Sequence, residues 1–280
     1  MLPSRARLAR VRRRQQARPF AARVAGPPAP CAARAVSPGL RYSARTRVAC
    51  GPLALALATL RALTAALVLA RLAAAPEHVC FPTEDGGVVY ADLYGEGKRG
   101  LVLAHGAAFD KSSWEKQAPV LAKAGFRVLA IDFRGKGQSR GPGQSDLYTA
   151  PLHFDVLAAV RYLRQTGATT VSVVGGSMGG GAAAGASVEA GPGEIDRVVL
   201  LGADAEKPEG LKGRKLFILC RDDPSSDGSP RLLKIRKDYE RASQPKELVV
   251  LDGAAHAQFI FASEQGERLM RELLRFLSAP

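Results

Sequence analysis

The sequence predicts an α/β fold built on one doubly wound, mostly parallel sheet. After about residue 76, short apolar runs of strand length alternate with segments of helical period. In the middle of the chain, the β-branched run 169–174 leads through a glycine-rich turn into the Ala/Gly-rich segment 178–190. Because the short runs are apolar throughout, they are typical of parallel strands that are buried on both faces.

The expected elements follow one another from about residue 78. Val156, Leu157, Val160 and Leu163 share one face of an amphipathic helix, and Ser112 or Ser113 is expected to cap an earlier one. No internal repeat or linker interrupts residues 76–280, which we treat as one domain. Strands are expected at 88–94, 101–104, 127–133, 171–174, 198–201, 216–220 and 248–251. Helices are expected at 112–125, 151–165, 178–190, 229–242 and 264–278.

The positive charge of the chain is confined to its N-terminal part. The net charge is +14, and residues 1–76 hold 14 arginines with no lysine and no acidic residue. Of 40 basic and 26 acidic residues in the chain, 26 of each therefore lie in 77–280. That part has no basic stripe with interleaved aromatic residues, so nucleic acid is not an expected partner.

The N-terminal part predicts a leader followed by a targeting or anchor segment. Residues 1–52 are rich in Arg, Ala, Pro and Ser without an apolar period, and we expect them to be disordered. The segment 53–75 is mostly apolar, and its longest uncharged run, 62–70, has the length of a signal-peptide core. Arg71 and the long leader depart from a simple signal peptide. We favour export or membrane association through 53–75; organelle import and a downstream start that leaves the protein cytoplasmic are the alternatives.

The stretch Gly175–Gly179 has the pattern Gly-x-Ser-x-Gly between a strand and a helix. A serine on such a sharp turn is held in a strained conformation with its hydroxyl exposed. Three consecutive glycines, 179–181, follow it, although each costs about 1 kcal/mol in a helix interior. Tight packing beneath the turn would explain them. We therefore expect Ser177 to be a nucleophile, against the alternative of a plain strand–turn–helix connection.

A serine nucleophile needs a base, which is usually a histidine. Four histidines occur in the chain. His78 is expected to precede the first strand, His105 to have a structural role within its loop, and His153 to open a helix. His256 follows the strand 248–251 on a loop at the carboxyl end of the sheet, the edge where open α/β sheets bind ligands. We expect His256 to be the base.

The carboxylate that orients the base should leave a strand at the same edge. Asp222 and Asp223 both follow the strand 216–220, and Asp204 follows the strand before it. We choose Asp223 because Pro224 fixes the turn after it, with Asp222 as the second candidate and Asp204 as a third. The chain order is then Ser177, Asp223, His256, which matches one known arrangement of the three residue types.

Two backbone amides are needed to stabilise the developing oxyanion. One is expected from Met178, directly after the nucleophile. The other is expected from Ala107, in the turn that follows the strand 101–104.

Taken together, these segments resemble the α/β-hydrolase family. The resemblance is carried by His105-Gly106-Ala107, the Asp-x-Arg-Gly-x-Gly-x-Ser segment 132–139, the turn 175–179, Asp223-Pro224 and His256. It covers nearly all of 80–280 and implies the esterase, lipase and peptidase-like branches, since dehalogenase and epoxide hydrolase branches use Asp as nucleophile. Only 202–215 separates two strands where many members carry a lid, so we expect no lid domain and an open site.

The expected function is therefore cleavage of an ester, thioester or related acyl bond of a small-molecule substrate, with no cofactor and no metal. A zinc site is not expected, because the four cysteines form no Cys-x-x-Cys pair or Cys/His cluster. A peptidase or acyltransferase on the same residues is an alternative, and a catalytically silent binding scaffold is the rival from another class. The sequence specifies neither the acyl group, nor the leaving group, nor the oligomeric state.

Overall fold

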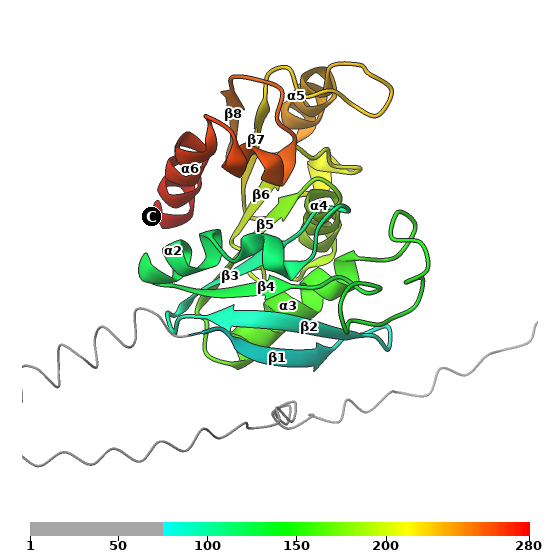
Figure 1. The fold of residues 1–280 in the computed structure, drawn as a ribbon, viewed down its shortest axis with the longest axis vertical. Coiled ribbons are helices and arrows are strands. Elements are labelled where there is room, and N and C mark those ends of the chain that lie inside the picture. Colours follow the sequence, from blue (N-terminus) through cyan, green and yellow to red (C-terminus); the bar gives the residue numbers. More distant parts are fainter. Residues whose placement is uncertain (1–74) are drawn as a thin grey trace, which may run out of the picture.

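The computed structural model describes residues 75–280, which form one eight-stranded sheet with helices on both faces (Figure 1). The leader 1–52 and the segment 53–74 lie outside the described residues, so the predictions made for them stay predictions. Within residues 75–280, no helix combines the length and apolarity needed to cross a bilayer. The strands are β1 (Glu77–Pro82), β2 (Val88–Tyr94), β3 (Arg99–Ala104), β4 (Phe126–Ile131), β5 (Thr170–Gly176), β6 (Arg197–Leu201), β7 (Arg214–Cys220) and β8 (Lys246–Leu251).

The sheet is mostly parallel, as the sequence predicts. Its strand order is β1-β2-β4-β3-β5-β6-β7-β8. β1 pairs with β2 and β2 with β4 in antiparallel fashion, while every pair from β4 to β8 is parallel. The carboxyl ends of β3, β5, β7 and β8 therefore meet at one edge, where the candidate site residues follow them.

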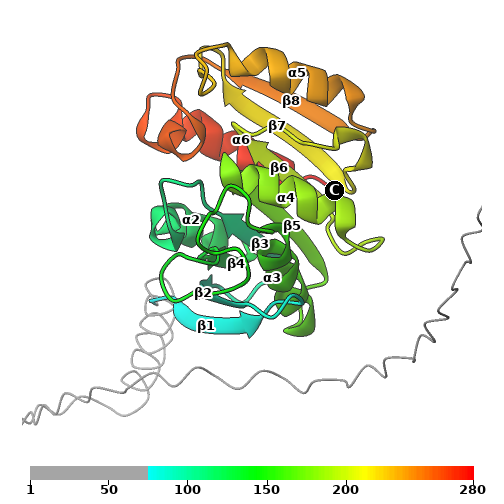
Figure 2. The same cartoon turned by 90° about the vertical axis from the view of Figure 1, so that its right-hand side faces the viewer.

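Helices α3, α4 and α5 cover one face of the sheet, and α2 and α6 cover the other (Figures 1 and 2). Short 3₁₀ turns lie between them. The helices are α2 (Gln117–Lys123), α3 (His153–Gln165), α4 (Met178–Glu189), α5 (Arg231–Arg241) and α6 (Gly266–Ser278), and the 3₁₀ turns are η1 (Lys111–Trp114), η2 (Pro208–Gly210) and η3 (Ala257–Ala262).

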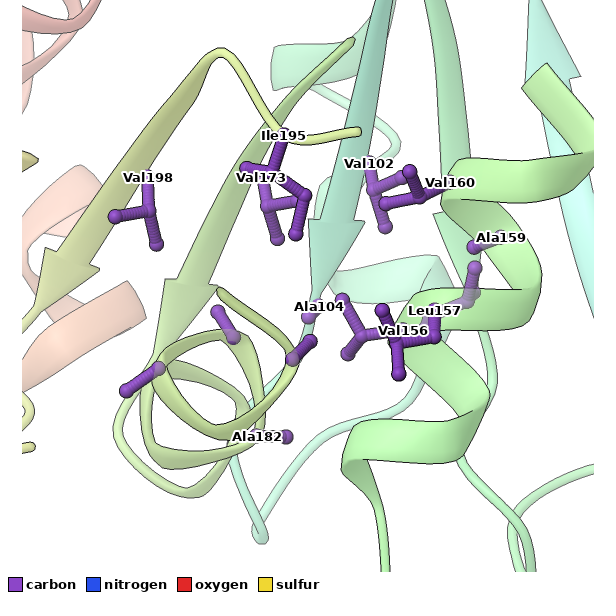
Figure 3. Packing of buried hydrophobic residues seen from close by; sticks show 14 of the residues in the cluster. Val102, Ala104, Val156, Leu157, Ala159, Val160, Val173, Ala182, Ile195 and Val198 are labelled. Carbon is purple, nitrogen blue, oxygen red and sulfur yellow. The ribbon is translucent and has the colours of Figure 1, made fainter. Parts of the chain in front are cut away.

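The core consists of two apolar clusters separated by the sheet. Successive residues of one strand contribute to opposite clusters: Val173 packs under α3 and α4, whereas Val174 packs on the side of α2 and α6. Both are fully buried. This two-sided burial explains why the strand runs are apolar without alternation. Figure 3 shows the first cluster, where Val160 of α3 packs beside Val102 of β3 and Val156 lies beside Ala104.

Two predictions about the first third of the domain are wrong. The single helix expected at 112–125 is divided into η1 and α2, and Asp110, rather than Ser112 or Ser113, caps η1 through its side chain. Pro119 explains the division: it has no N–H to donate, so it is accommodated only within the first turn of a helix. His78 does not precede the first strand; it lies in β1, with Nδ1 2.5 Å from Oδ1 of Asp92.

The loop after β4 is held by a buried ion-pair network. Neither Arg134 nor Asp155 has an exposed side chain, and Nη2 of Arg134 lies 2.6 Å from Oδ1 of Asp155. Nη1 of Arg134 contacts Asp85 at 2.5 Å and donates to the carbonyl of Pro142 at 2.9 Å. Nε also donates to Asp155 and Nη2 to Asp85, so every N–H of the guanidinium has an acceptor. Arg134 therefore fixes the path of the following loop, which forms one wall of the candidate site.

Candidate active site

Ser177 occupies a strained turn between β5 and α4. Its backbone has φ 51° and ψ −120°, a combination that residues other than glycine rarely adopt. The two flanking glycines and Gly180 are required by space, since a Cβ at Gly175, Gly179 or Gly180 would collide with neighbouring backbone or with Ala203. Gly181 has no neighbour that would exclude a side chain. Close packing therefore explains two of the three consecutive glycines after the serine, and the structure gives no steric reason for the third.

The hydroxyl of Ser177 is hydrogen-bonded to His256. Oγ of Ser177 lies 2.8 Å from Nε2 of His256. His256 directly precedes η3, on the loop that leaves the carboxyl end of β8, and its side chain is 28% exposed. The imidazole is thus partly exposed and within proton-transfer distance of the serine.

Asp223, rather than Asp222, contacts the histidine. Its Oδ2 lies 2.7 Å from Nδ1 of His256, and its side chain is fully buried, whereas Asp222 is exposed. Asp204 lies on the cavity wall and forms an ion pair with Lys234. The structure therefore brings Ser177, Asp223 and His256 together and leaves the two other candidate carboxylates outside this hydrogen-bonded chain.

Arg231, a residue that the sequence did not single out, also contacts the buried carboxylate. Nε of Arg231 lies 3.3 Å from the same Oδ2 of Asp223, and Nη2 donates to the carbonyl of Pro224. Oδ1 of Asp223 is buried and has no hydrogen-bond partner among the residues that the structure describes. The positive charge of Arg231 thus lies on the one carboxylate oxygen that also contacts His256.

Ala107 and Met178 both line the cavity beside Ser177. Gly106, which precedes Ala107, packs close to the carbonyl of Gly176 and to Cβ of Ser177. In the described part of the chain, neither the Ala107 nor the Met178 amide donates a hydrogen bond to another protein group. Two N–H groups near the serine are thus available to an incoming oxygen atom.

His105 holds the turn that carries Ala107. Nδ1 of His105 lies 2.8 Å from the carbonyl oxygen of Gly106, and Nε2 accepts a hydrogen bond from the amide of Phe133 at 3.2 Å. The ring is fully buried, and this desolvation lowers the pKa of His105 from 6.5 to about 4. His105 is therefore neutral near pH 7, with the proton on Nδ1, and both ring nitrogens are occupied by the backbone.

A cavity of about 600 Å³ opens beside the serine. One wall comes from the loop before α3, and the opposite wall comes from the segment after β6 and from the start of α5. That segment holds only the three-residue turn η2, so it forms no helical lid. His153 lies on the wall and pairs with Glu189 at 3.2 Å. The larger side chains that line the cavity outside the serine turn are Leu147, Tyr148, Leu152, His153, Asp204, Glu206 and Arg231, and Ala107, Ala150, Ala182 and Ala203 also line it.

No cluster of His, Cys, Asp or Glu side chains within residues 75–280 has the arrangement of a metal site. The site groups that the sequence did not reveal are Arg231 and Gln258. Gln258 lies two residues after His256 and contacts the turn that carries Ala107. Neither residue is part of a recognisable sequence motif, because each is brought to the site only by tertiary contacts.

Comparisons with known proteins agree with this fold. The family described as "alpha/beta hydrolase fold" matches residues 101–219. A non-heme haloperoxidase of Rhodococcus erythropolis is 34% identical over 137 residues, which is 45% of this chain and 47% of that protein. Bifunctional epoxide hydrolase 2 of Sus scrofa is 38% identical over 82 residues, 29% of this chain and 14% of that protein. The chain thus spans about half or less of the length of these relatives.

Solved structures share the fold at low identity. The esterase Pf2001 of Pyrococcus furiosus superimposes with a TM-score of 0.60 at 21% identity, covering 73% of this chain and 94% of that one. An esterase of Exiguobacterium antarcticum gives a TM-score of 0.58 at 17% identity, covering 71% and 99%. At such low sequence identities, these superpositions show a shared fold and nothing more.

Proposed function

Because this chain has the α/β-hydrolase fold, we propose that it is a serine hydrolase that cleaves an ester, thioester or related acyl bond. The observation that carries the proposal is the continuous hydrogen-bonded chain from Ser177 through His256 to Asp223, at 2.8 and 2.7 Å. The fold alone would not support it, since one fold hosts many functions.

In the proposed reaction, Oγ of Ser177 attacks the acyl carbon while Nε2 of His256 takes its proton. Asp223 holds Nδ1–H of the imidazole, which fixes the tautomer and stabilises the imidazolium that forms. The amides of Ala107 and Met178 stabilise the oxyanion of the tetrahedral intermediate. His256 then gives its proton to the departing group, which leaves an acyl-enzyme on Ser177. Water, deprotonated by His256, attacks that ester, and the acid product departs as Ser177 regains its proton.

A serine at the nucleophile position supports acyl chemistry over the reactions of branches that use an aspartate there. The haloperoxidase and epoxide hydrolase names describe the relatives, and their shared segments cover only parts of this chain. The open cavity, with both apolar and charged walls, fits a small acyl substrate.

The proposal is tested by covalent labelling of the full chain with a fluorophosphonate probe, combined with a panel of p-nitrophenyl esters. We expect wild-type protein to be labelled and to hydrolyse at least one short-chain ester. The Ser177→Ala variant should lose labelling, and its ester turnover should fall by about 10³-fold or more. Ser226 is exposed on the loop before α5, so Ser226→Ala is the matched control and should behave like wild type.

Undiminished labelling of Ser177→Ala, or wild-type protein that neither reacts with the probe nor hydrolyses any ester, would reject the proposal. The second result would favour a silent binding scaffold. Peptide p-nitroanilides and added alcohol acceptors extend the same assay, because faster cleavage of the former indicates a peptidase and transfer to the latter an acyltransferase.

A further inference from the structure

We infer that Gln258 is a positioning residue that holds the oxyanion turn, residues 105–107, in place beside Ser177. This inference rests on the proposed serine-hydrolase function, because it assigns the turn a role in stabilising the transition state. The side chain of Gln258 bridges the oxyanion turn and Ser113, both about 150 residues away in the chain. Three contacts support the assignment.

The first contact is a hydrogen bond to the turn itself. The amide of Gly106 donates to Oε1 of Gln258 at 2.6 Å. Gln258 is 6% exposed, so water does not compete effectively for this bond. Its side chain also packs against Gly176, directly before Ser177, where a Cβ would lie 3.0 Å from Oε1. The same amide group thus touches both the oxyanion turn and the serine turn.

The second contact orients the amide group. Nε2 of Gln258 donates to Oγ of Ser113 at 2.6 Å, and the Ser113 hydroxyl in turn donates to the carbonyl of Asp110 at 2.6 Å. Because the hydroxyl hydrogen is used on Asp110, Oγ of Ser113 is an acceptor toward Gln258. The amide nitrogen must therefore face Ser113, which leaves the oxygen facing Gly106.

The third contact lies on the other side of Gly106. The carbonyl of Gly106 belongs to the same peptide group as the N–H of Ala107, and it is bonded to Nδ1 of His105. In a trans peptide the two groups point in opposite directions, so this bond directs the Ala107 N–H away from His105. Gln258 fixes the preceding peptide group. Gly106 has no side chain to restrict its rotation, and the two hydrogen bonds together supply that restriction.

Gln258 also connects the oxyanion turn to the proposed base. Only Ala257, with a φ of 48°, separates it from His256. One short segment therefore carries the proton acceptor and the support for the oxyanion turn. The turn's N–H is needed most when negative charge develops on the substrate, so loss of Gln258 should lower kcat and leave KM nearly unchanged.

The test compares steady-state hydrolysis of p-nitrophenyl acetate, or of the best ester in the panel, by full-length variants. Gln258→Met keeps the side-chain length and removes both hydrogen bonds. We expect kcat to fall by about 10- to 100-fold, which is less than the effect of losing an oxyanion donor itself, with KM changed by no more than about twofold.

The inhibition constant of a trifluoromethyl ketone, whose adduct places an oxyanion on the turn, should rise by the same factor as kcat falls. Gln258→Glu keeps an acceptor for the Gly106 amide and should recover most of the activity.

Gln244 provides the matched control, because its Oε1 accepts from the amide of Lys246 at 3.1 Å at an exposed position that does not line the cavity. Gln244→Met should leave kcat and the inhibition constant unchanged. Should Gln258→Met fail to fold, Ser113→Ala removes the group that orients the amide and should lower kcat with the same unchanged KM.

A folded Gln258→Met variant with wild-type kcat, or one whose kcat loss is not matched by weaker ketone binding, overturns the inference. In the fallback, wild-type kcat in Ser113→Ala overturns it as well. Each of these outcomes is measured against an active wild-type enzyme, so it would overturn the role of Gln258 without contradicting the proposed function. Wild-type protein without hydrolysis or labelling would reject the proposed function and this inference together.

Discussion

Oδ2 of Asp223 lies 2.7 Å from Nδ1 of His256, and the carboxylate is fully buried, whereas the imidazole is partly exposed. The backbone after β7 explains why this aspartate reaches the histidine. The amide of Asp222 is bonded to the carbonyl of Gly253 on the neighbouring loop, so its side chain faces solvent. The side chain of Asp223 then points inward, where Arg231 also contacts it.

Substitution of the two adjacent aspartates should therefore have very different effects. Asp223→Asn removes the charge that holds the histidine tautomer and should lower kcat by roughly 10⁴-fold. Asp222→Asn changes an exposed side chain and should alter kcat by about twofold or less. Steady-state ester hydrolysis of both variants, with circular dichroism to verify folding, makes the comparison. A larger loss in Asp222→Asn would reverse the assignment.

The strained backbone of Ser177 predicts a gain in stability when function is removed. A φ of 51° with a ψ of −120° is natural for glycine and costs other residues of order 1–3 kcal/mol. The free energy of unfolding of Ser177→Gly should therefore exceed that of Ser177→Ala by about 1–2 kcal/mol, because alanine keeps the strain. The glycine variant should accordingly unfold at a higher urea concentration. Both variants should be inactive, so the difference isolates the backbone. Equal urea midpoints would show that the turn is relaxed.

Most of the fold is predictable from local patterns. Every strand from β2 to β8 and each of the helices α3 to α6 begins or ends within a few residues of its predicted position. The apolar runs and helical periods carry this information because strands buried on both faces tolerate few polar residues. The sequence predicts no bounds for β1, since an edge strand that is partly exposed has a weak apolar pattern. The helical period across 112–125 predicts one continuous helix, but Pro119 confines α2 to a start near Gln117.

The candidate site was predictable only where a residue follows a strand end. Ser177, Asp223 and His256 each lie at the carboxyl edge of the sheet, which is a property of topology. Their roles remain a proposal, as do those of Ala107 and Met178. Gln258 and Arg231 were not predictable, because their importance depends on which distant groups they touch, and no spacing in the chain records those contacts.

The buried His105 should make the protein less stable in mild acid. Desolvation lowers its pKa to about 4 in the folded state, below the 6.5 of the unfolded chain. Its contribution is therefore fully present above pH 6.5 and is lost as the pH falls toward 4, because only the unfolded chain binds the proton in that range. Between pH 7 and pH 5 this residue alone should reduce the free energy of unfolding by about 2 kcal/mol.

The measurement is urea unfolding at both pH values for wild-type protein and His105→Gln, which cannot titrate. The three other histidines are common to both proteins, so their effects cancel. The change in unfolding free energy between the two pH values should be smaller in the variant, whatever its absolute stability. An identical pH dependence would mean that His105 titrates normally in the folded protein.

The buried pair of Arg134 and Asp155 should contribute to substrate binding through the cavity wall. Asp155→Asn leaves a fully buried guanidinium without one of its two carboxylates, which should cost about 3–5 kcal/mol of stability. Arg134 also holds the carbonyl of Pro142, and the loop that follows supplies Leu147 and Tyr148 to the cavity. A loosened loop should raise KM, whereas kcat at saturating ester should change little, since no group that contacts the reacting atoms is altered.

Glu84→Gln is the matched control for this prediction. Glu84 pairs with Arg161 of the same helix α3 but is 64% exposed, so the loss of its charge should cost less than about 1 kcal/mol of stability. Urea unfolding and ester kinetics on both variants test the assignment, and an Asp155→Asn variant with wild-type KM would show that the loop keeps its shape without this pair.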